Sequence, residues 1–205
     1  SSGLIVSGTS MATIIAAKTA RDAALDYASR AQGVGQAKLT GYVSAEAHSC
    51  LARAFDMIGL GTDALRIIPV NAAFQIDVQA LAEQVRYDRE NGCLPFFLAG
   101  TAGTVNTGAI DDLAALAAFA QKQKLWFHVD GAFGASAITS SDIAPRLVGI
   151  QQADSIAFDF HKWMHVNYAA GCVLIRDRAL HRNAFANRPD YLAADAEALA
   201  GGNPW

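Results

Sequence analysis

Residues 154–163 read DSIAFDFHKW. The middle of this stretch is a short apolar run that is typical of a strand, and a His-Lys pair follows where that strand should end. A second apolar run upstream, residues 125–132, reads LWFHVDGA, and Asp130 lies near its end. The two stretches together predict neighbouring strands of one sheet, each presenting a reactive side chain at its carboxyl end.

Apolar runs of strand length alternate with helical patterns along the rest of the chain. Asp77 has the character of a helix N-cap, and Asp111 or Asp112 opens a later Ala/Leu-rich helix. We expect helices over residues 12–30, 47–58, 77–92, 112–124 and from about 177, and strands over 39–43, 65–70, 94–99, 125–129, 155–158 and 171–175. This order predicts an α/β fold with three layers, α/β/α, and a mostly parallel central sheet.

Composition limits the class of protein. The chain has 205 residues, of which 52% are hydrophobic and 17% charged, so it can bury a large core as one domain over residues 1–205. A net charge of −3 argues against a nucleic-acid partner, and no apolar run is long enough to span a membrane. Three widely spaced cysteines favour reduced thiols and a cytoplasmic location.

The two ends of the sequence resemble neither a signal peptide nor a closing element. The chain starts SSGLIV, without an initiator Met or a basic segment, and it ends GGNPW. We expect N- and C-terminal parts of a longer pattern to be missing.

A lysine and an aspartate at the ends of two strands suit pyridoxal 5′-phosphate (PLP) chemistry. The Lys162 amine can form a Schiff base with the cofactor, and the Asp130 carboxylate can hold the pyridine nitrogen protonated. Ala132 is small enough to lie under a flat ring. The alternative interpretations are a carboxylate that caps a neighbouring loop and a lysine on the surface.

Three further segments could complete such a site. Thr9 and Ser10 follow Gly8 at a helix start, where unpaired N–H groups favour a phosphate, although taken alone this segment is more often a plain N-cap. His48, expected in the first turn of a helix, could stack on a cofactor ring or serve as a capping histidine. Thr104 lies in a Gly-rich turn after a strand and could hydrogen-bond a ligand.

Five segments in this order resemble the group II PLP-dependent decarboxylases, which include aromatic-L-amino-acid decarboxylase and glutamate decarboxylase. They are GTSMAT (8–13), AEAHSCLARA (45–54), GTAGTVNTGAIDDL (100–113), WFHVDGAFGAS (126–136) and ADSIAFDFHKWMHVNYAAGCVLIRD (153–177). Members often carry an acidic residue where Met11 stands, and Asn-Pro or Ser-Pro where this chain has Asp159-Phe160.

The resemblance implies the large domain of PLP fold type I, a homodimer, and decarboxylation of an L-amino acid, with an aromatic one as the first guess. It implies no metal. Lys162, His48 and Asp130 would be catalytic. The residues that would bind the cofactor are Thr9, Ser10, His48, Thr104, Asp130, Ala132, His161 and Lys162.

Two alternatives stay open at this point. The first is another fold type I chemistry, such as that of an aminotransferase, a cysteine desulfurase or an aldolase-like enzyme, because one fold hosts many reactions. The second is a non-catalytic fragment that keeps the fold without turnover.

Overall fold

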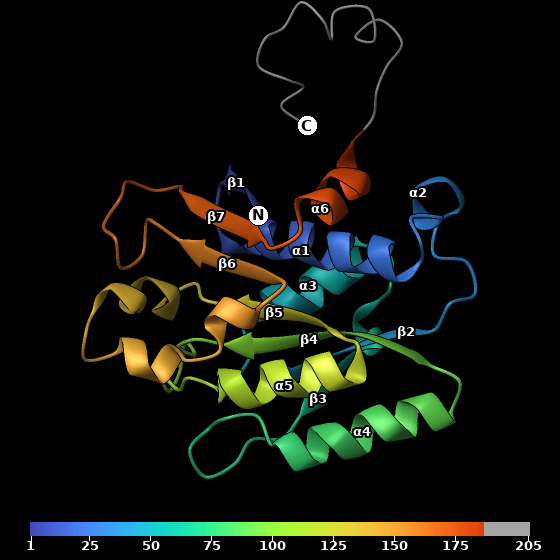
Figure 1. Cartoon of the computed structure of the whole chain (residues 1–205), viewed down its shortest axis with the longest axis horizontal. Coiled ribbons are helices and arrows are strands. Elements are labelled where there is room, and N and C mark those ends of the chain that lie inside the picture. Colours follow the sequence, from blue (N-terminus) through green and yellow to red (C-terminus); the bar gives the residue numbers. More distant parts are fainter. Residues whose placement is uncertain (187–205) are drawn as a thin grey trace, which may run out of the picture.

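The structure, a computed structural model, describes residues 1–186, so that residues 187–205 of the predicted domain lie outside the described part (Figure 1). Its centre is a sheet of seven strands in the order β1-β7-β6-β5-β4-β2-β3. The strands are β1 (Ser2–Val6), β2 (Leu39–Ser44), β3 (Leu65–Ile68), β4 (Leu94–Thr101), β5 (Trp126–Asp130), β6 (Ser155–Asp159) and β7 (Gly171–Ile175).

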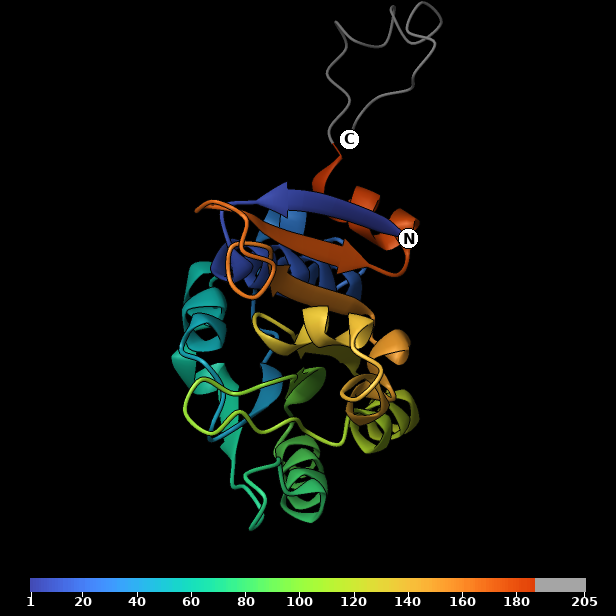
Figure 2. The same ribbon diagram turned by 90° about the vertical axis from the view of Figure 1, so that its left-hand side faces the viewer.

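The sheet is mostly parallel, as predicted. β3, β2, β4, β5 and β6 pair in parallel, whereas β7 is antiparallel to both of its neighbours, β6 and β1. Figure 2 shows β1 and β7 side by side at one end of the sheet. The carboxyl ends of β4, β5 and β6 therefore meet at one edge, which is where open α/β sheets bind ligands.

Helices cover both faces of the sheet and complete the three layers. The main helices are α1 (Thr9–Ala24), α3 (Cys50–Met57), α4 (Val78–Glu90), α5 (Leu113–Gln123) and α6 (Arg178–Phe185), with a short α2 (Ser29–Gln32). α4 and α5 bury Leu81 and Leu116 against Phe127, whereas α1 and α3 bury Ala17 and Phe55 on the other face. The fold predicted from the apolar runs is thereby confirmed.

The first helix is shorter than expected and ends at Ala24 rather than near residue 30. The buried carboxylate of Asp22 accepts hydrogen bonds from Lys18, Arg21 and Ser29. To bring Ser29 back to Asp22, the chain turns through two residues with positive φ, Asp26 and Tyr27. The Ala-rich pattern predicts the helix, but it does not predict the turn that ends the helix at Ala24.

Other boundaries also differ from the prediction. β1 was not predicted, because its partner β7 lies far away in the sequence and five residues of alternating burial carry a weak local signal. β3 ends at Ile68, since Pro69 has no N–H to continue the ladder. The loop between β5 and β6 contains three 3₁₀ turns, Gly134–Thr139, Ala144–Leu147 and Ile150–Gln152.

Two kinds of feature do not occur among residues 1–186. No helix there combines the length and the apolar character needed to cross a bilayer. No group of three or more His, Cys, Asp or Glu side chains in the same part of the chain could hold a metal ion.

Candidate active site

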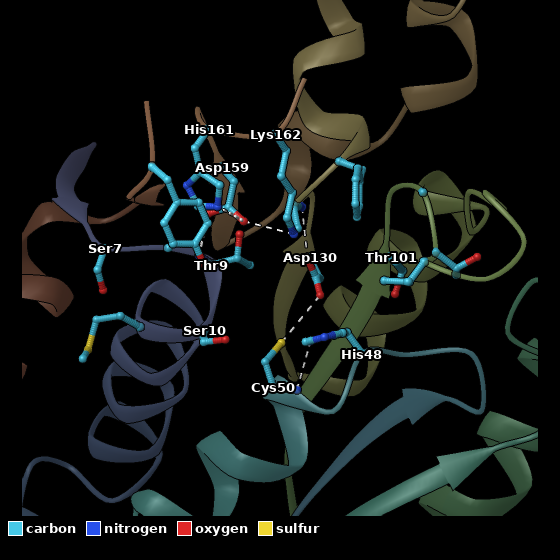
Figure 3. Close-up of a pocket in the computed structure, with 18 residues that line it drawn as sticks. Ser7, Thr9, Ser10, His48, Cys50, Thr101, Asp130, Asp159, His161 and Lys162 are labelled. Carbon is cyan, nitrogen blue, oxygen red and sulfur yellow. Dashed lines mark hydrogen bonds and ion pairs between the residues drawn. The ribbon is translucent and has the colours of Figure 1, made fainter. Parts of the chain in front are cut away.

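A pocket of about 310 Å³ lies at the carboxyl ends of β4, β5 and β6 (Figure 3). The start of α1 and the segment before α3 close it from the side. It brings together every site residue predicted from the sequence, namely Thr9, Ser10, His48, Thr104, Asp130, Ala132, His161 and Lys162. Segments spread over more than 150 positions of the chain thus converge on one cavity.

Asp130 ends β5 and is almost completely buried in the pocket, with 3% of its surface exposed. Its Oδ1 accepts a hydrogen bond from the N–H of Ala132 at 3.1 Å. Burial raises the pKa of this carboxyl group, and the Lys162 charge acts in the opposite direction. Because Asp130 has no salt bridge within residues 1–186, a cationic N–H donor from a ligand would compensate it well.

Cys50, the first residue of α3, lies against Asp130. Its Sγ is 3.9 Å from Asp130 Oδ2 and is buried. Burial, followed by the nearby Asp130 charge, raises the pKa of the thiol to about 12, so the thiol stays protonated and donates to the carboxylate.

His48 was predicted to lie in the first turn of the helix. In the structure it lies two residues before the start of α3. Its Nδ1 accepts a hydrogen bond from the N–H of Cys50 at 3.2 Å, so the ring caps α3. The side chain nevertheless lines the pocket. The cap uses Nδ1, so Nε2 is the ring nitrogen that is not engaged in the cap. The capping and ligand-facing interpretations of His48 are therefore compatible.

Lys162 lies in the turn after β6 and reaches into the same pocket as Asp130 (Figure 3). Its Nζ is 3.1 Å from Asp159 Oδ2 and 4.4 Å from the centre of the Phe133 ring. Phe158 and Phe160, which precede it in the sequence, pack against each other instead. The aromatic contact of the amine thus comes from the loop after β5.

The start of α1 presents two hydroxyl side chains to the pocket. Thr9 is buried, and its Oγ1 has no hydrogen-bond partner within residues 1–186. Ser10 is exposed and lines the pocket beside it. The backbone N–H of Thr9 donates to Asp159 Oδ1 at 2.7 Å. One of the N–H groups predicted to bind a phosphate therefore already donates to a side-chain oxygen from β6.

The remaining predicted residues line the pocket with their own local partners. Thr104 Oγ1 accepts a hydrogen bond from the N–H of Ala109 and so holds its turn together. His161 Nδ1 contacts the backbone of Ala170, and its ring packs on Tyr168. His128, which lies on β5 but does not line the pocket, is fully buried, and burial lowers its pKa to about 3.

Several residues that line the pocket were not among the predicted site residues, including Cys50, Thr101, Phe133 and Asp159. Thr101 pairs in register with Asp130 on the neighbouring strand, and its buried Oγ1 has no partner within residues 1–186. Its position at the end of β4 could have identified it, because Asp130 and Asp159 end the next two strands in the same way.

The groups that line the pocket fit PLP. The unpartnered hydroxyl groups of Thr9 and Thr101 offer donors, and Asp130 offers a buried anion for a protonated ring nitrogen. The Lys162 amine supplies a nucleophile that shares the pocket with that anion. The residues that could hold the cofactor are those that the sequence predicted, together with Thr101.

Comparison with known proteins defines the class. The chain matches the pyridoxal-dependent decarboxylase conserved domain over residues 1–202, and it belongs to that family. The predicted family is therefore confirmed.

The sequence of the chain is similar to those of amino-acid decarboxylases from a bacterium and a plant. The chain is 37% identical over 190 residues to aromatic-L-amino-acid decarboxylase of Bacillus atrophaeus, covering 93% of this chain and 38% of the relative. It is 29% identical to tryptophan decarboxylase 2 of Oryza sativa subsp. japonica, covering 99% of this chain and 41% of that protein. The chain thus spans about two fifths of the length of these relatives.

Solved structures support the fold. Oryza sativa TDC with PLP and tryptamine has a TM-score of 0.86 at 30% identity, covering 97% of this chain and 41% of that one. The glutamate decarboxylase domain of a Vibrio parahaemolyticus protein has a TM-score of 0.85 at 33% identity, covering 88% and 40%. The predicted fold type I architecture is confirmed, and the predicted PLP cofactor agrees with the family description and with the rice structure.

Proposed function

We propose that this chain forms the PLP-binding part of an amino-acid decarboxylase, a carboxy-lyase that converts an L-amino acid to an amine and CO₂. The observation that carries the proposal is the shared pocket of Lys162 and Asp130. A nucleophilic amine and a buried, otherwise unpaired carboxylate are the two groups that a pyridine aldehyde cofactor requires from its protein.

Bound PLP would supply an electron sink for the pair of electrons left when the substrate loses its carboxylate. Lys162 would hold the cofactor through Nζ and release it to the substrate amine. Asp130 would keep a proton on the ring nitrogen, held in place by the N–H of Ala132 and the thiol of Cys50. Thr9 and Ser10 would bind the phosphate group.

His48 is the side chain best suited to lie over the cofactor ring. Its Nδ1 is fixed by the N–H of Cys50, which limits rotation of the imidazole. The ring then offers Nε2 to the substrate or to a proton in transit. Ala132, Thr104 and His161 line the pocket around this position and would contact the cofactor.

We also propose an aromatic L-amino acid as the substrate, a homodimer as the assembly and the cytoplasm as the location. The relatives described above that are named as aromatic-amino-acid and tryptophan decarboxylases support the substrate class. Residues 1–205 would form the single PLP-binding large domain of the protein.

A panel assay tests this function. The purified chain is incubated with PLP and a series of L-amino acids, and CO₂ release is measured. We expect CO₂ and the matching amine from an aromatic amino acid. Formation of a keto acid instead would indicate an aminotransferase, and cofactor binding without any product would indicate a non-catalytic domain.

A further inference from the structure

Asp159 is the pocket residue whose surroundings the proposed function does not explain. It ends β6, and 4% of its surface is exposed. Its Oδ1 accepts the Thr9 N–H at 2.7 Å, while Oδ2 lies 3.1 Å from Lys162 Nζ and 3.8 Å from His161 Nε2. A single carboxylate therefore contacts the first N–H of α1, the reactive amine and an imidazole.

The backbone around Asp159 is shaped to admit this carboxylate. A Cβ atom on Gly171 would lie 2.7 Å from Asp159 Oδ1 and 2.6 Å from the Cα atom of Gly8. Any larger residue at position 171 would push the start of α1 away from the end of β6. The close approach of β6, β7 and α1 thus fixes the carboxylate against the helix.

The contacts of Asp159 overlap with those that the cofactor needs. The first N–H groups of a helix and its positive dipole end attract an anion, and here the anion is already part of the chain. Gly8, the N-cap of α1, provides no side-chain acceptor, so Asp159 caps the helix from another element. A phosphate group arriving at Thr9 and Ser10 would meet a fixed negative charge.

We propose that Asp159 is a positioning residue that holds the start of α1 and the Lys162 amine in place, and that its negative charge opposes binding of the cofactor's phosphate group. This inference rests on the proposed function, since it assumes that the cofactor binds in this pocket. It predicts that Asp159 lowers the affinity of the chain for PLP while it holds the Lys162 amine in position.

The test measures the binding of two probes, inorganic phosphate and pyridoxamine 5′-phosphate, by calorimetry of the full chain. The second probe lacks an aldehyde, so no bond to Lys162 contributes. Asp159→Asn keeps an oxygen for the Thr9 N–H and removes the charge. We expect it to bind both probes about tenfold more tightly than the wild-type chain, equivalent to about 1.4 kcal/mol.

Asp56→Asn is the matched control, because Asp56 is exposed on α3 and does not line the pocket. We expect it to bind both probes like the wild type. Thermal unfolding checks that each variant is folded, and Asp159→Thr offers a second neutral acceptor if the asparagine variant does not fold.

Two negative outcomes have separate meanings. If the wild-type chain binds pyridoxamine 5′-phosphate and a folded Asp159→Asn binds it equally or more weakly, the inference about Asp159 is wrong and the proposed function stands. If the wild-type chain and all variants fail to bind pyridoxamine 5′-phosphate, the proposed cofactor site itself is wrong.

Discussion

The environment of Asp130 is the strongest indication of a cationic ligand in the pocket. It is nearly fully buried, and its contacts come from one backbone N–H and one protonated thiol. Neither donor carries a charge, so the cost of burying the carboxylate is only partly offset. A protonated ring nitrogen would add a charge-assisted hydrogen bond at this point.

Replacing Asp130 by Ala should separate binding from chemistry. We expect the variant to retain PLP, because Lys162 and the start of α1 are untouched, and to lose at least about a hundredfold in decarboxylation rate, the scale of a lost preorganised charge. Absorbance reports the cofactor and CO₂ release reports the rate. Turnover near the wild-type value would rule out the proposal that this carboxylate supports decarboxylation by keeping the ring nitrogen protonated.

At the scale of elements, helix starts are set by local acceptors that the sequence displays. Asp77 accepts from the N–H groups of Gln79 and Ala80 at the start of α4, and Asp112 and Asp177 cap α5 and α6 in the same manner. The sequence predicted the Asp77 cap and the starts of the other two helices, at Asp111 or Asp112 and near Asp177, because each acceptor lies within three residues of its donors. α1 is different, since its acceptor comes from β6, 150 positions away.

Removal of the Asp77 cap should weaken the fold measurably. Asp77→Ala leaves two N–H groups of α4 without their side-chain acceptor, and we expect the free energy of unfolding to fall by about 1 kcal/mol. Urea denaturation followed by circular dichroism measures the change. Asp77→Ser, which keeps an oxygen at the N-cap, should recover most of it; equal losses in both variants would contradict a capping role.

At the scale of the whole molecule, the buried imidazole of His128 links stability to pH. Its ring stacks on Phe97, and Nδ1 contacts Ser155 Oγ, a group that also accepts from Trp126 Nε1. Burial lowers the folded-state pKa from 6.5 to about 3, so the unfolded chain takes up a proton first as the pH falls. The stability from the neutral ring is complete above pH 6.5 and is lost progressively below it.

Between pH 6.5 and pH 5 we expect His128 to reduce the free energy of unfolding by up to about 2 kcal/mol. Urea denaturation across this range, compared with that of His128→Gln, isolates the contribution. The variant should lose less stability than the wild type over the same interval. Parallel pH curves for the two proteins would show that His128 does not titrate on unfolding.

The features of the fold that depend on a local sequence pattern could be predicted from the sequence. Apolar runs gave six of the seven described strands, and the ends of two of them gave Asp130 and Lys162. β1 was missed because its evidence lies in a distant partner, β7. The ion pair of Asp159 with Lys162, and its bond to Thr9, depend on how closely α1 packs against β6, which no short stretch of sequence encodes.

The most direct test of the account is chemical trapping of the bond between the chain and PLP. The chain is mixed with PLP, reduced with borohydride, digested and analysed by mass spectrometry. We expect a pyridoxyl phosphate label on Lys162 and no label there in Lys162→Ala. A label on another lysine, such as Lys122 or Lys124 at the end of α5, with Lys162 unmodified, would contradict it.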